Sequence, residues 1–305
     1  MPSKIRPMSV PIRTLWDGFQ LSLEARGRSP RTILSYREAV LLFDRFLERH
    51  RLPQAIGVIQ RSHVEAFIAE LLRSGAPSSA ANRYRSLQQF FKWAAEVEEM
   101  ITTSPMAAMQ PPRVPEQRTD LLTREDLTKL LQACSGPHFE DRRDMAIVAL
   151  LIDTGMRRSE LAGIRVSDLD IRLQVAQVLG KGSRPRSCPF GKRTAVLLER
   201  YLRLRAGHRL AERPELWLAR IAPLSSSGVY QLLRERAKSA GLPPIHPHQF
   251  RHGFAHTFLA AGGQETDLMR LAGWSSRAML QRYGAAAADE RAHEAYRTRS
   301  PMDRL

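Results

Sequence analysis

Four histidines surround one arginine in the segment "IHPHQFRHGFAHTF", which begins at Ile245. Three of them, His248, His252 and His256, recur every four residues, so they share one face if the segment is a helix. Histidines at this spacing on a helix can bind a metal ion. A metal site is therefore the first chemistry that the segment suggests.

Arg251 argues against a metal site. It follows His248 by three residues, on the same helical face, where a permanent cation repels a metal ion and attracts a phosphate. Position 249 carries glutamine, whereas the H-E-x-x-H motif of metal-dependent hydrolases requires glutamate there. We therefore predict an anion site with no metal and no other cofactor. His248 is assigned to this site with His252 in support, and His246 and His256 are taken as structural.

A second polar group stands where a buried helix ends. In "DTGMRRSELAGIRVSDLD", Gly155 ends the helix that contains the apolar run "MAIVALLI", and Arg157, Arg158 and Glu160 follow at once. Arg157 and Glu160 could form a simple ion pair on a helix surface, and Arg158 suits a solvated position. From the residues alone, these side chains could be ordinary surface groups or members of a functional site.

Two further segments each carry a reactive side chain. In "LQVAQVLGKGSRPRSCPF", two short β-type runs flank a Gly-Lys-Gly-Ser turn, which predicts a hairpin with Lys181 at its tip. In "RLAGWSSRAMLQRYG", Trp274 precedes a helix cap at Ser275 or Ser276, and the segment ends on Tyr283 and a glycine. Each of these residues has an ordinary structural explanation when it is taken alone.

The ordered set resembles the tyrosine recombinases, the family of phage integrases and Xer-type recombinases. The resemblance rests on "TGMRRSEL" as the first arginine box, "GKG" in a hairpin, "HPHQFRH" as the H-x-x-R box, and "AGW" followed at the family's spacing by a tyrosine. It extends from about Leu121 to Tyr283, and the helical segment before it is similar to the family's core-site-binding domain. Trp274 is a departure, because many members have histidine there, although tryptophan also occurs.

The resemblance implies a catalytic set, and elementary phosphoryl chemistry gives each member a role. The implied set is Arg157, Lys181, His248, Arg251, Trp274 and Tyr283, with Glu160 and His252 in support. The two arginines would bind the non-bridging phosphate oxygens, and the lysine would protonate the leaving 5′ oxygen. The histidine would share the proton of the tyrosine nucleophile, while the indole N–H of the tryptophan would bond a phosphoryl oxygen. The glutamate would orient the cations from behind.

Charge and composition favour a nucleic-acid partner. The 305 residues carry 47 Lys+Arg against 31 Asp+Glu, a formal net charge of +16. The two cysteines, Cys134 and Cys188, form no C-x-x-C pair, so neither a disulfide framework nor a cysteine-based zinc site is indicated. The longest apolar run is far shorter than the roughly 20 residues of a membrane span, and the N-terminus lacks the apolar core of a signal peptide. We expect a cytoplasmic protein, associated with the bacterial nucleoid when bound to DNA, and no membrane partner.

The helical patterns predict two domains around a proline-rich linker. Four helices are expected between Ile12 and about Thr102, the second beginning at Ser29 with Pro30, and the third at a capping box of residues 62–65. Aromatic residues on the fourth helix are read as core, and not as a base-stacking platform. A capping box at Thr123 opens the second domain. The expected domains are residues 1–104 and 121–305, with residues 105–120 as the linker.

The sequence therefore predicts a mainly α fold, with a small β-hairpin or sheet in the C-terminal domain. By resemblance it is a helical core-binding domain followed by a tyrosine recombinase catalytic domain. The implied enzyme is a metal- and ATP-independent DNA strand-transferase that forms a 3′-phosphotyrosine, in phage or mobile-element integration and excision. Its implied partner is double-stranded DNA with inverted half-sites, bound by a homotetramer in the synaptic complex and by a monomer when free. An accessory directionality factor is left open.

Three alternatives stay open at this point. A Xer-type dimer resolvase or a transposon recombinase would use the same chemistry, and the sequence cannot separate them from an integrase. A catalytically inactive DNA-binding protein is opposed by the complete catalytic set. A metal-dependent nuclease would lose its activity in the presence of a chelator.

Overall fold

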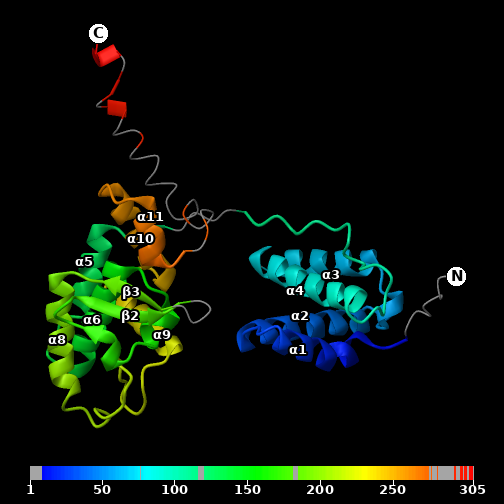
Figure 1. Cartoon of the computed structure of the whole chain (residues 1–305), viewed down its shortest axis with the longest axis horizontal. Helices are drawn as coiled ribbons and strands as arrows, with labels where there is room; N and C mark the ends of the chain where they lie inside the picture. Colours follow the sequence, from blue (N-terminus) through cyan, green and yellow to red (C-terminus); the bar gives the residue numbers. More distant parts are fainter. Residues whose placement is uncertain are drawn as a thin grey trace. The chain divides into compact units, whose positions relative to one another are not determined.

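The computed structural model describes residues 9–75, 77–115, 120–180, 185–274, 276, 280, 292, 296–297, 299–300 and 302–304. The chain forms two compact units, Met1–Gln117 and Arg118–Leu305 (Figure 1). Each unit has its own hydrophobic core. Among the described residues, all regular structure is helical apart from one three-stranded antiparallel sheet in the C-terminal unit. The predicted fold class is confirmed.

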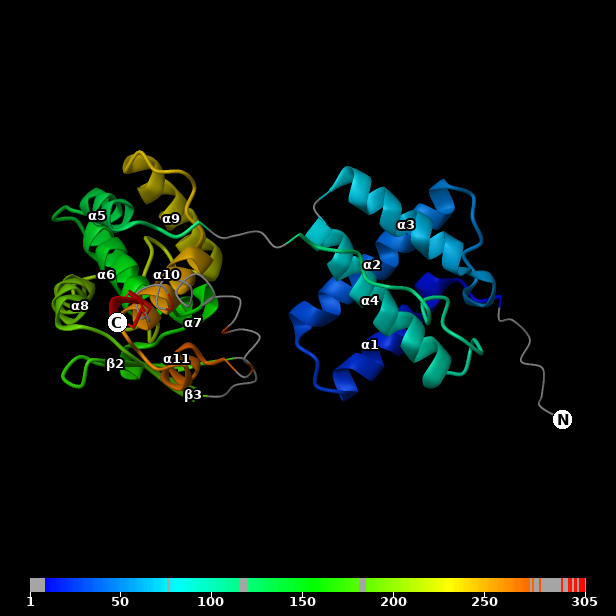
Figure 2. The ribbon, with the colours of Figure 1, turned by 90° about the horizontal axis from the view of Figure 1, so that it is seen from above.

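The N-terminal unit is a bundle of four α-helices with two short 3-10 turns. Its elements are η1 (Ile12–Leu15), α1 (Trp16–Ala25), α2 (Pro30–Arg49), η2 (Ile56–Val58), α3 (Arg61–Ser74) and α4 (Pro77–Glu96). Helix α4 packs against both α2 and α3, and α1 packs against α2 (Figures 1 and 2). The aromatic side chains of α4, including Phe90, Phe91 and Trp93, are buried in the core of this unit. Their interpretation as core residues is confirmed.

Two predicted helix starts have different outcomes. Ser29 caps α2, because its hydroxyl accepts the N–H of Thr32 at 3.2 Å and Pro30 occupies the first turn. The expected capping box of residues 62–65 is wrong. Helix α3 begins at Arg61, and the main-chain N–H of Gln60 donates to Nδ1 of His63 at 3.2 Å. The acceptor is the ring nitrogen of His63, whereas the prediction assigned this role to the carboxylate of Glu65.

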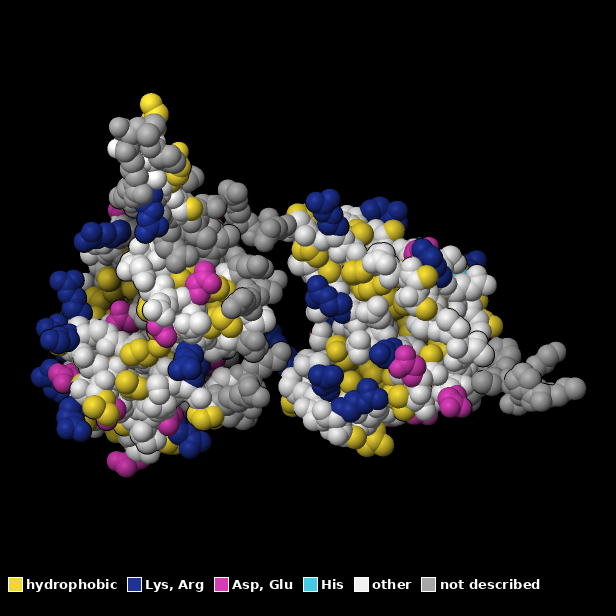
Figure 3. Space-filling model, turned by 45° about the horizontal axis from the view of Figure 1, so that its top comes forward, with side chains coloured by type: hydrophobic (Ala, Val, Ile, Leu, Met, Phe, Trp, Pro, Cys, Tyr) yellow, Lys and Arg dark blue, Asp and Glu magenta, His cyan; other side chains and the backbone are white. Residues whose placement is uncertain are grey.

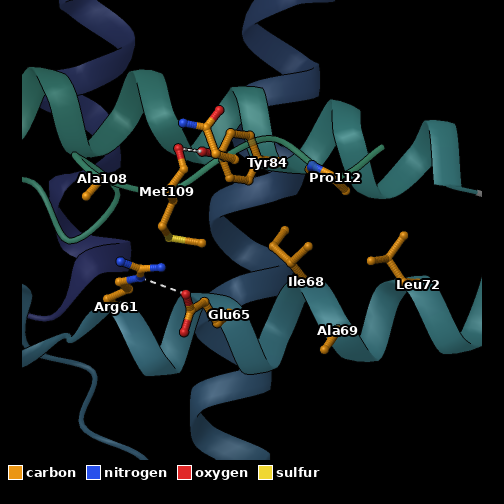
Figure 4. A pocket seen from close by; sticks show the side chains of 10 residues that line it. Arg61, Glu65, Ile68, Ala69, Leu72, Tyr84, Ala108, Met109 and Pro112 are labelled. Atoms are coloured by element: carbon orange, nitrogen blue, oxygen red, sulfur yellow. Dashed lines mark hydrogen bonds and ion pairs between the residues drawn. The ribbon is translucent and has the colours of Figure 1, made fainter. Parts of the chain in front are cut away.

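The first part of the proline-rich segment packs on the N-terminal unit. Met106 and Met109 belong to its core, and the buried hydroxyl of Tyr84 donates to the carbonyl oxygen of Met109 at 2.7 Å (Figure 4). Figure 4 also shows Arg61 and Glu65, which form an ion pair at 2.7 Å on α3. The segment between Ser104 and Met109 is therefore anchored against α3 and α4.

The C-terminal unit surrounds one buried helix, α6, which packs against α5, α8, α10 and β3 (Figure 2). Strand β2 pairs antiparallel with β3, which confirms the predicted hairpin, and β1 adds an edge strand that was not predicted. The elements are α5 (Arg124–Ala133), α6 (Phe139–Thr154), α7 (Arg158–Ala162), η3 (Val166–Asp168), β1 (Leu169–Asp170), β2 (Val175–Leu179), β3 (Pro185–Pro189), α8 (Lys192–Arg205), α9 (Ser226–Ser239), α10 (Pro247–Ala260), α11 (Glu265–Ala272) and η4 (Met302–Arg304). Within the described part of the chain, no helix has the length and apolar character of a membrane span.

Candidate active site

The junction between α6 and α7 places the first arginine. Helix α6 ends at Gly155, whose φ of 53° lies in the left-handed region. A Cβ at this position would lie 2.8 Å from Cβ of Phe254 on α10, so the close approach of the two helices also requires glycine. Arg157 follows two residues later and stands at the N-cap of α7.

Glu160 holds Arg157 through two contacts. The main-chain N–H of Arg157 donates to Oε2 of Glu160 at 2.8 Å, and its Nη1 lies 2.6 Å from Oε1. The side chain of Glu160 is 3% exposed, whereas that of Arg157 is 31% exposed. The interpretation of a simple surface ion pair is therefore wrong. A buried carboxylate anchors an arginine that faces solvent.

The environment of Glu160 keeps it ionised. Burial by itself raises the pKa of Glu160, but the main-chain N–H of Arg157 and the guanidinium groups of Arg186 and Arg157 outweigh burial and hold the pKa below its usual value. Arg186, on β3, donates from Nη2 to Oε2 of Glu160 at 2.7 Å. The carboxylate is therefore a fixed negative charge between two cations.

Arg251 is buried in the C-terminal unit with only 2% of its surface exposed. Its Nη1 donates to the carbonyl oxygen of Gly155 at 3.0 Å, and its Nη2 donates to that of Ala272. These carbonyls belong to the C-terminal ends of α6 and α11, where the helix dipoles favour a cation. The guanidinium carbon lies 5.3 Å from the centre of the Trp274 ring. Main-chain carbonyls and one indole therefore fix this charge in place.

His248 lies on the first turn of α10 with only part of its surface exposed, and it has a lowered pKa. Partial burial, followed by the positive charges of Arg251, Arg157 and Arg158, disfavours the charged imidazolium and moves the pKa below 6.5. The imidazole is therefore neutral near pH 7 and can accept a proton.

The other three histidines of the cluster have separate surroundings. His246 is the N-cap of α10 and stacks on Tyr230 of α9, with ring centres 5.7 Å apart. His252 and His256 are half-buried on α10. Among the residues that the structure describes, no three His, Cys, Asp or Glu side chains are arranged to hold a metal ion.

Trp274 follows the end of α11 and is 6% exposed. Its position depends on Gly273, which has a φ of 64° and ends the helix in the left-handed conformation. The indole packs in a small apolar cluster with residues of α10 and α11, including Leu259 and Leu268. Lys181 and Tyr283, the other two members of the predicted set, lie outside the described residues.

Sequence reasoning missed Arg186. The available signal was the alternation of β3, in which Arg186 and Cys188 occupy the inward-facing positions while their neighbours are exposed. An arginine beside a buried cysteine on such a face needs an internal partner, and Glu160 supplies it. The choice of partner depends on the approach of α7 to the sheet, which has no signature in the sequence of β3.

A second cluster of cations lies beside the site. The guanidinium carbons of Arg158 on α7 and Arg234 on α9 lie 5.6 and 5.9 Å from the centre of the Tyr230 ring. Tyr230 also stacks on His246, the N-cap of the helix that carries His248 and Arg251. These groups extend the positive charge of the site along α7 and α9.

Comparisons with known families cover both units. The family described as "Phage integrase family" matches residues 120–290, and the one described as "Phage integrase, N-terminal SAM-like domain" matches residues 17–97. The tyrosine recombinase XerC of Myxococcus xanthus is 30% identical over 284 residues, which are 88% of this chain and 92% of the relative. The tyrosine recombinase XerD of Bifidobacterium longum is 28% identical over 292 residues, which are 92% of this chain and 94% of the relative.

Solved structures share the fold. A lambda integrase dimer bound to a COC′ core site has a TM-score of 0.73 at 22% identity, covering 90% of this chain and 77% of that one. The XerH site-specific recombinase bound to palindromic difH substrate has a TM-score of 0.72 at 16% identity, covering 93% of this chain and 84% of that one. Because the integrase match spans more than half of the sequence and the XerC relative most of it, the chain belongs to the phage integrase family of tyrosine recombinases.

Proposed function

We propose that this protein is a site-specific DNA recombinase that cuts and rejoins duplex DNA through a covalent phosphotyrosine. The observation that supports this most is the grouping of Arg157 and Arg251 with a neutral imidazole. Both guanidiniums act on His248, and the carbonyl oxygen of Gly155, two residues before Arg157, accepts from Arg251. Two permanent cations can stabilise the charge on a phosphodiester during nucleophilic substitution at phosphorus, and the nearby imidazole can accept the proton of the nucleophile.

In the proposed reaction, the phenol oxygen of Tyr283 attacks the phosphorus as the bond to the 5′ oxygen breaks. His248 accepts the phenol proton, and Lys181 donates a proton to the leaving oxygen. Arg157 and Arg251 donate to the non-bridging oxygens, where negative charge gathers in the transition state. The products are a 3′-phosphotyrosine and a 5′-hydroxyl. Since one phosphoester replaces another, rejoining runs as the reverse attack and needs neither ATP nor a metal.

The proposed substrate is duplex DNA with inverted half-sites, one protomer on each half-site and four protomers in the synaptic complex. Basic side chains are prominent on the visible faces of each unit, as a phosphate backbone requires (Figure 3). Lambda integrase has been solved as a dimer on a core site and as a tetramer on a Holliday junction, which supports a similar assembly here. The free protein is a monomer in this proposal, and it works in the cytoplasm, where the DNA is.

A second candidate, a Xer-type dimer resolvase, is favoured by the names of the relatives. The XerC and XerD recombinases match over 88 to 92% of the chain. The two candidates share their chemistry and differ in the DNA they recombine. An integrase of a mobile element commonly lies beside its own attachment site, so the DNA that flanks the gene distinguishes them, as does a requirement for an accessory directionality factor.

The proposed chemistry is tested with Tyr283→Phe on a labelled suicide substrate, which traps the covalent complex after cleavage. We expect the variant to bind DNA and to give no covalent band on a denaturing gel, while wild-type protein gives the band in EDTA as well as without it. Tyr296→Phe is the control, because Tyr296 is 64% exposed and should leave the band unchanged. A covalent band with Tyr283→Phe, or a band abolished by EDTA, would reject the proposed mechanism.

A further inference from the structure

Arg186 contacts two segments that lie next to proposed catalytic residues. Its Nη2 donates to Oε2 of Glu160 on α7 at 2.7 Å, and its Nη1 donates to the carbonyl oxygen of Leu271 in the last turn of α11. The same Nη1 lies 2.9 Å from Sγ of Cys188 on β3. The side chain of Arg186 is 10% exposed. One buried guanidinium therefore joins α7, β3 and α11.

The two arginines on Glu160 differ in what each can do. Arg157 is 31% exposed, so it can turn toward a phosphate, whereas Arg186 is enclosed between α7 and α11. If Arg157 moved onto a phosphate and Glu160 had no other cation, a buried carboxylate would lose its charge compensation, which is costly. Arg186 removes this cost because it stays on Oε2. The side chain of Arg157 can therefore bind DNA while Glu160, which accepts the main-chain N–H of Arg157, keeps Arg186 as its cationic partner.

The contact with α11 reaches the other side of the site. A Cβ on Gly273 would lie 2.9 Å from Cδ of Arg186, so the chain passes directly against the arginine just before Trp274. Arg186 and Arg251 donate to consecutive carbonyls of α11, those of Leu271 and Ala272. The end of this helix is therefore held by two guanidiniums, one of which is a proposed phosphate ligand.

We propose that Arg186 is a positioning residue for DNA cleavage. It keeps Glu160 as a compensated anion while Arg157 binds the phosphate, and it fixes the end of α11 beside Trp274. It acts through these groups and does not touch the reacting atoms. This inference rests on the proposed recombinase function and adds a residue outside the catalytic and supporting set that the family resemblance implied.

The first test compares Arg186→Met with a matched control, Arg236→Met. Arg236 on α9 also bridges carboxylates, Asp141 and Asp144, and a main-chain carbonyl, that of Ala133, but its partners lie near the start of α6 and in α5. Covalent complex formation is measured in single turnover at saturating DNA, with DNA affinity and thermal unfolding beside it. We expect Arg186→Met to slow cleavage by about 10²-fold with affinity changed by no more than roughly twofold. Arg236→Met should lower stability and leave the cleavage rate within about twofold.

The second test is the pH profile of cleavage, which a merely structural role would not move. The charged groups that act on Glu160 are Arg157 and Arg186, while the Cys188 thiol stays protonated because burial raises its pKa to about 11. On α9, which packs against α7, the nearby cation Arg234 lies over Tyr230. Without the Arg186 cation the pKa of Glu160 rises toward that of His248, so protonation of Glu160 adds to protonation of His248, and the acid limb of Arg186→Met should be steeper and lie at higher pH than that of wild type.

Two further variants isolate the carboxylate and the charge. Arg186→Lys keeps the charge but lacks the planar fork, so it should keep the wild-type acid limb and recover only part of the rate. In a Glu160→Gln background, Arg186→Met should cause no shift of the acid limb, because no carboxyl remains to titrate.

The outcomes separate this inference from the function on which it rests. If wild-type protein forms no covalent complex, the proposed function fails. If wild-type protein cleaves while Arg186→Met keeps both its rate and its acid limb, or loses rate only as Arg236→Met does, the positioning role is overturned and the recombinase stands. Should Arg186→Met fail to fold, Arg186→Lys decides, since a full wild-type rate in that variant overturns the role.

Discussion

The guanidinium of Arg251 and the indole ring of Trp274 pack against each other, with the guanidinium carbon 5.3 Å from the ring centre. The arginine comes from α10, and the tryptophan follows α11 in the chain. The ring covers a cation that the carbonyl oxygens of Gly155 and Ala272 also hold. The packing of the ring on this cation is observed, and the donor role of the indole N–H stays a prediction.

Substitutions of Trp274 should separate those two roles. Trp274→Phe keeps a ring over Arg251 and loses the indole N–H, so we expect near-normal stability and a cleavage rate lower by about tenfold. Trp274→Ala also leaves a cavity and should lower the free energy of unfolding by about 3 kcal/mol. Chemical denaturation and single-turnover cleavage measure the two effects. Equal stability of the two variants would show that the ring does not support the site.

Cleavage should depend on pH through His248. The proposed role requires the neutral imidazole, so the rate should fall as the pH falls through the pKa of His248, with its midpoint below 6.5. Arg158→Ala removes one of the cations that lower this pKa and should move the midpoint to higher pH. Arg203→Ala, an exposed arginine on α8, is the charge-matched control. Identical shifts in both variants would point to net charge and not to His248.

Gly155→Ala should be more harmful than Gly241→Ala. Both glycines have positive φ, at 53° and 69°, but a Cβ at Gly155 would meet Cβ of Phe254 at 2.8 Å, whereas a Cβ at Gly241 has nothing within 4 Å. We expect a loss of about 1 kcal/mol for Gly241→Ala from backbone strain alone, and about 3 kcal/mol for Gly155→Ala. Gly155→Ala should also slow cleavage, because its carbonyl oxygen holds Arg251. Equal effects in thermal unfolding would contradict the steric argument.

Lys181→Ala should respond to the leaving group. In a substrate whose leaving 5′ oxygen is replaced by sulfur, the leaving group departs as a thiolate and needs no proton. This substrate should therefore restore cleavage by Lys181→Ala if Lys181 is the general acid. A lysine that only contacts the backbone would give equal defects on both substrates. The ratio of the two single-turnover rates is the measurement, with Arg186→Lys as a comparison that should show no such rescue.

Both cysteines should resist thiol reagents in the native state. Burial raises the pKa of Cys134 to about 12 and that of Cys188 to about 11. At pH 8 the thiolate fraction is then on the order of a thousandth or less, and the thiolate is the reactive form. Native protein should react with a disulfide reagent far more slowly than urea-unfolded protein. Rapid labelling of one cysteine in the folded protein would show that its segment opens readily.

The local parts of the fold could be predicted where a short segment carries its own signal. Ser29 with Pro30 and Thr123 with Asp126 begin α2 and α5, because the capping hydrogen bonds lie within four residues. The hairpin of β2 and β3 follows in the same way from alternation around a turn. The start of α3 was misjudged because the nitrogen of His63, which the pattern of hydroxyls and carboxylates does not include, caps the helix.

The residue types of the candidate site could be predicted from the sequence. The buried contacts that hold these residues in place could not. Arg157 and Glu160 are three residues apart, so their contact could be anticipated, but the burial of Glu160 could not. Arg186 reaches Glu160 across 26 positions and Leu271 across 85, and such contacts depend on how α7, β3 and α11 pack. The catalytic roles of the whole set, including Lys181 and Tyr283, stay predictions.

The steric fit of Gly273 against Arg186 has a consequence for the evolution of the family. A side chain at position 273 would need the space that Cδ and Nε of Arg186 occupy, at 2.9 and 3.0 Å from the added atom. A relative with a larger residue in place of this glycine must therefore move the arginine side chain or carry a smaller residue in its place, and a relative without the arginine must compensate its buried carboxylate in another way. The two positions should covary, although 87 residues of sequence separate them.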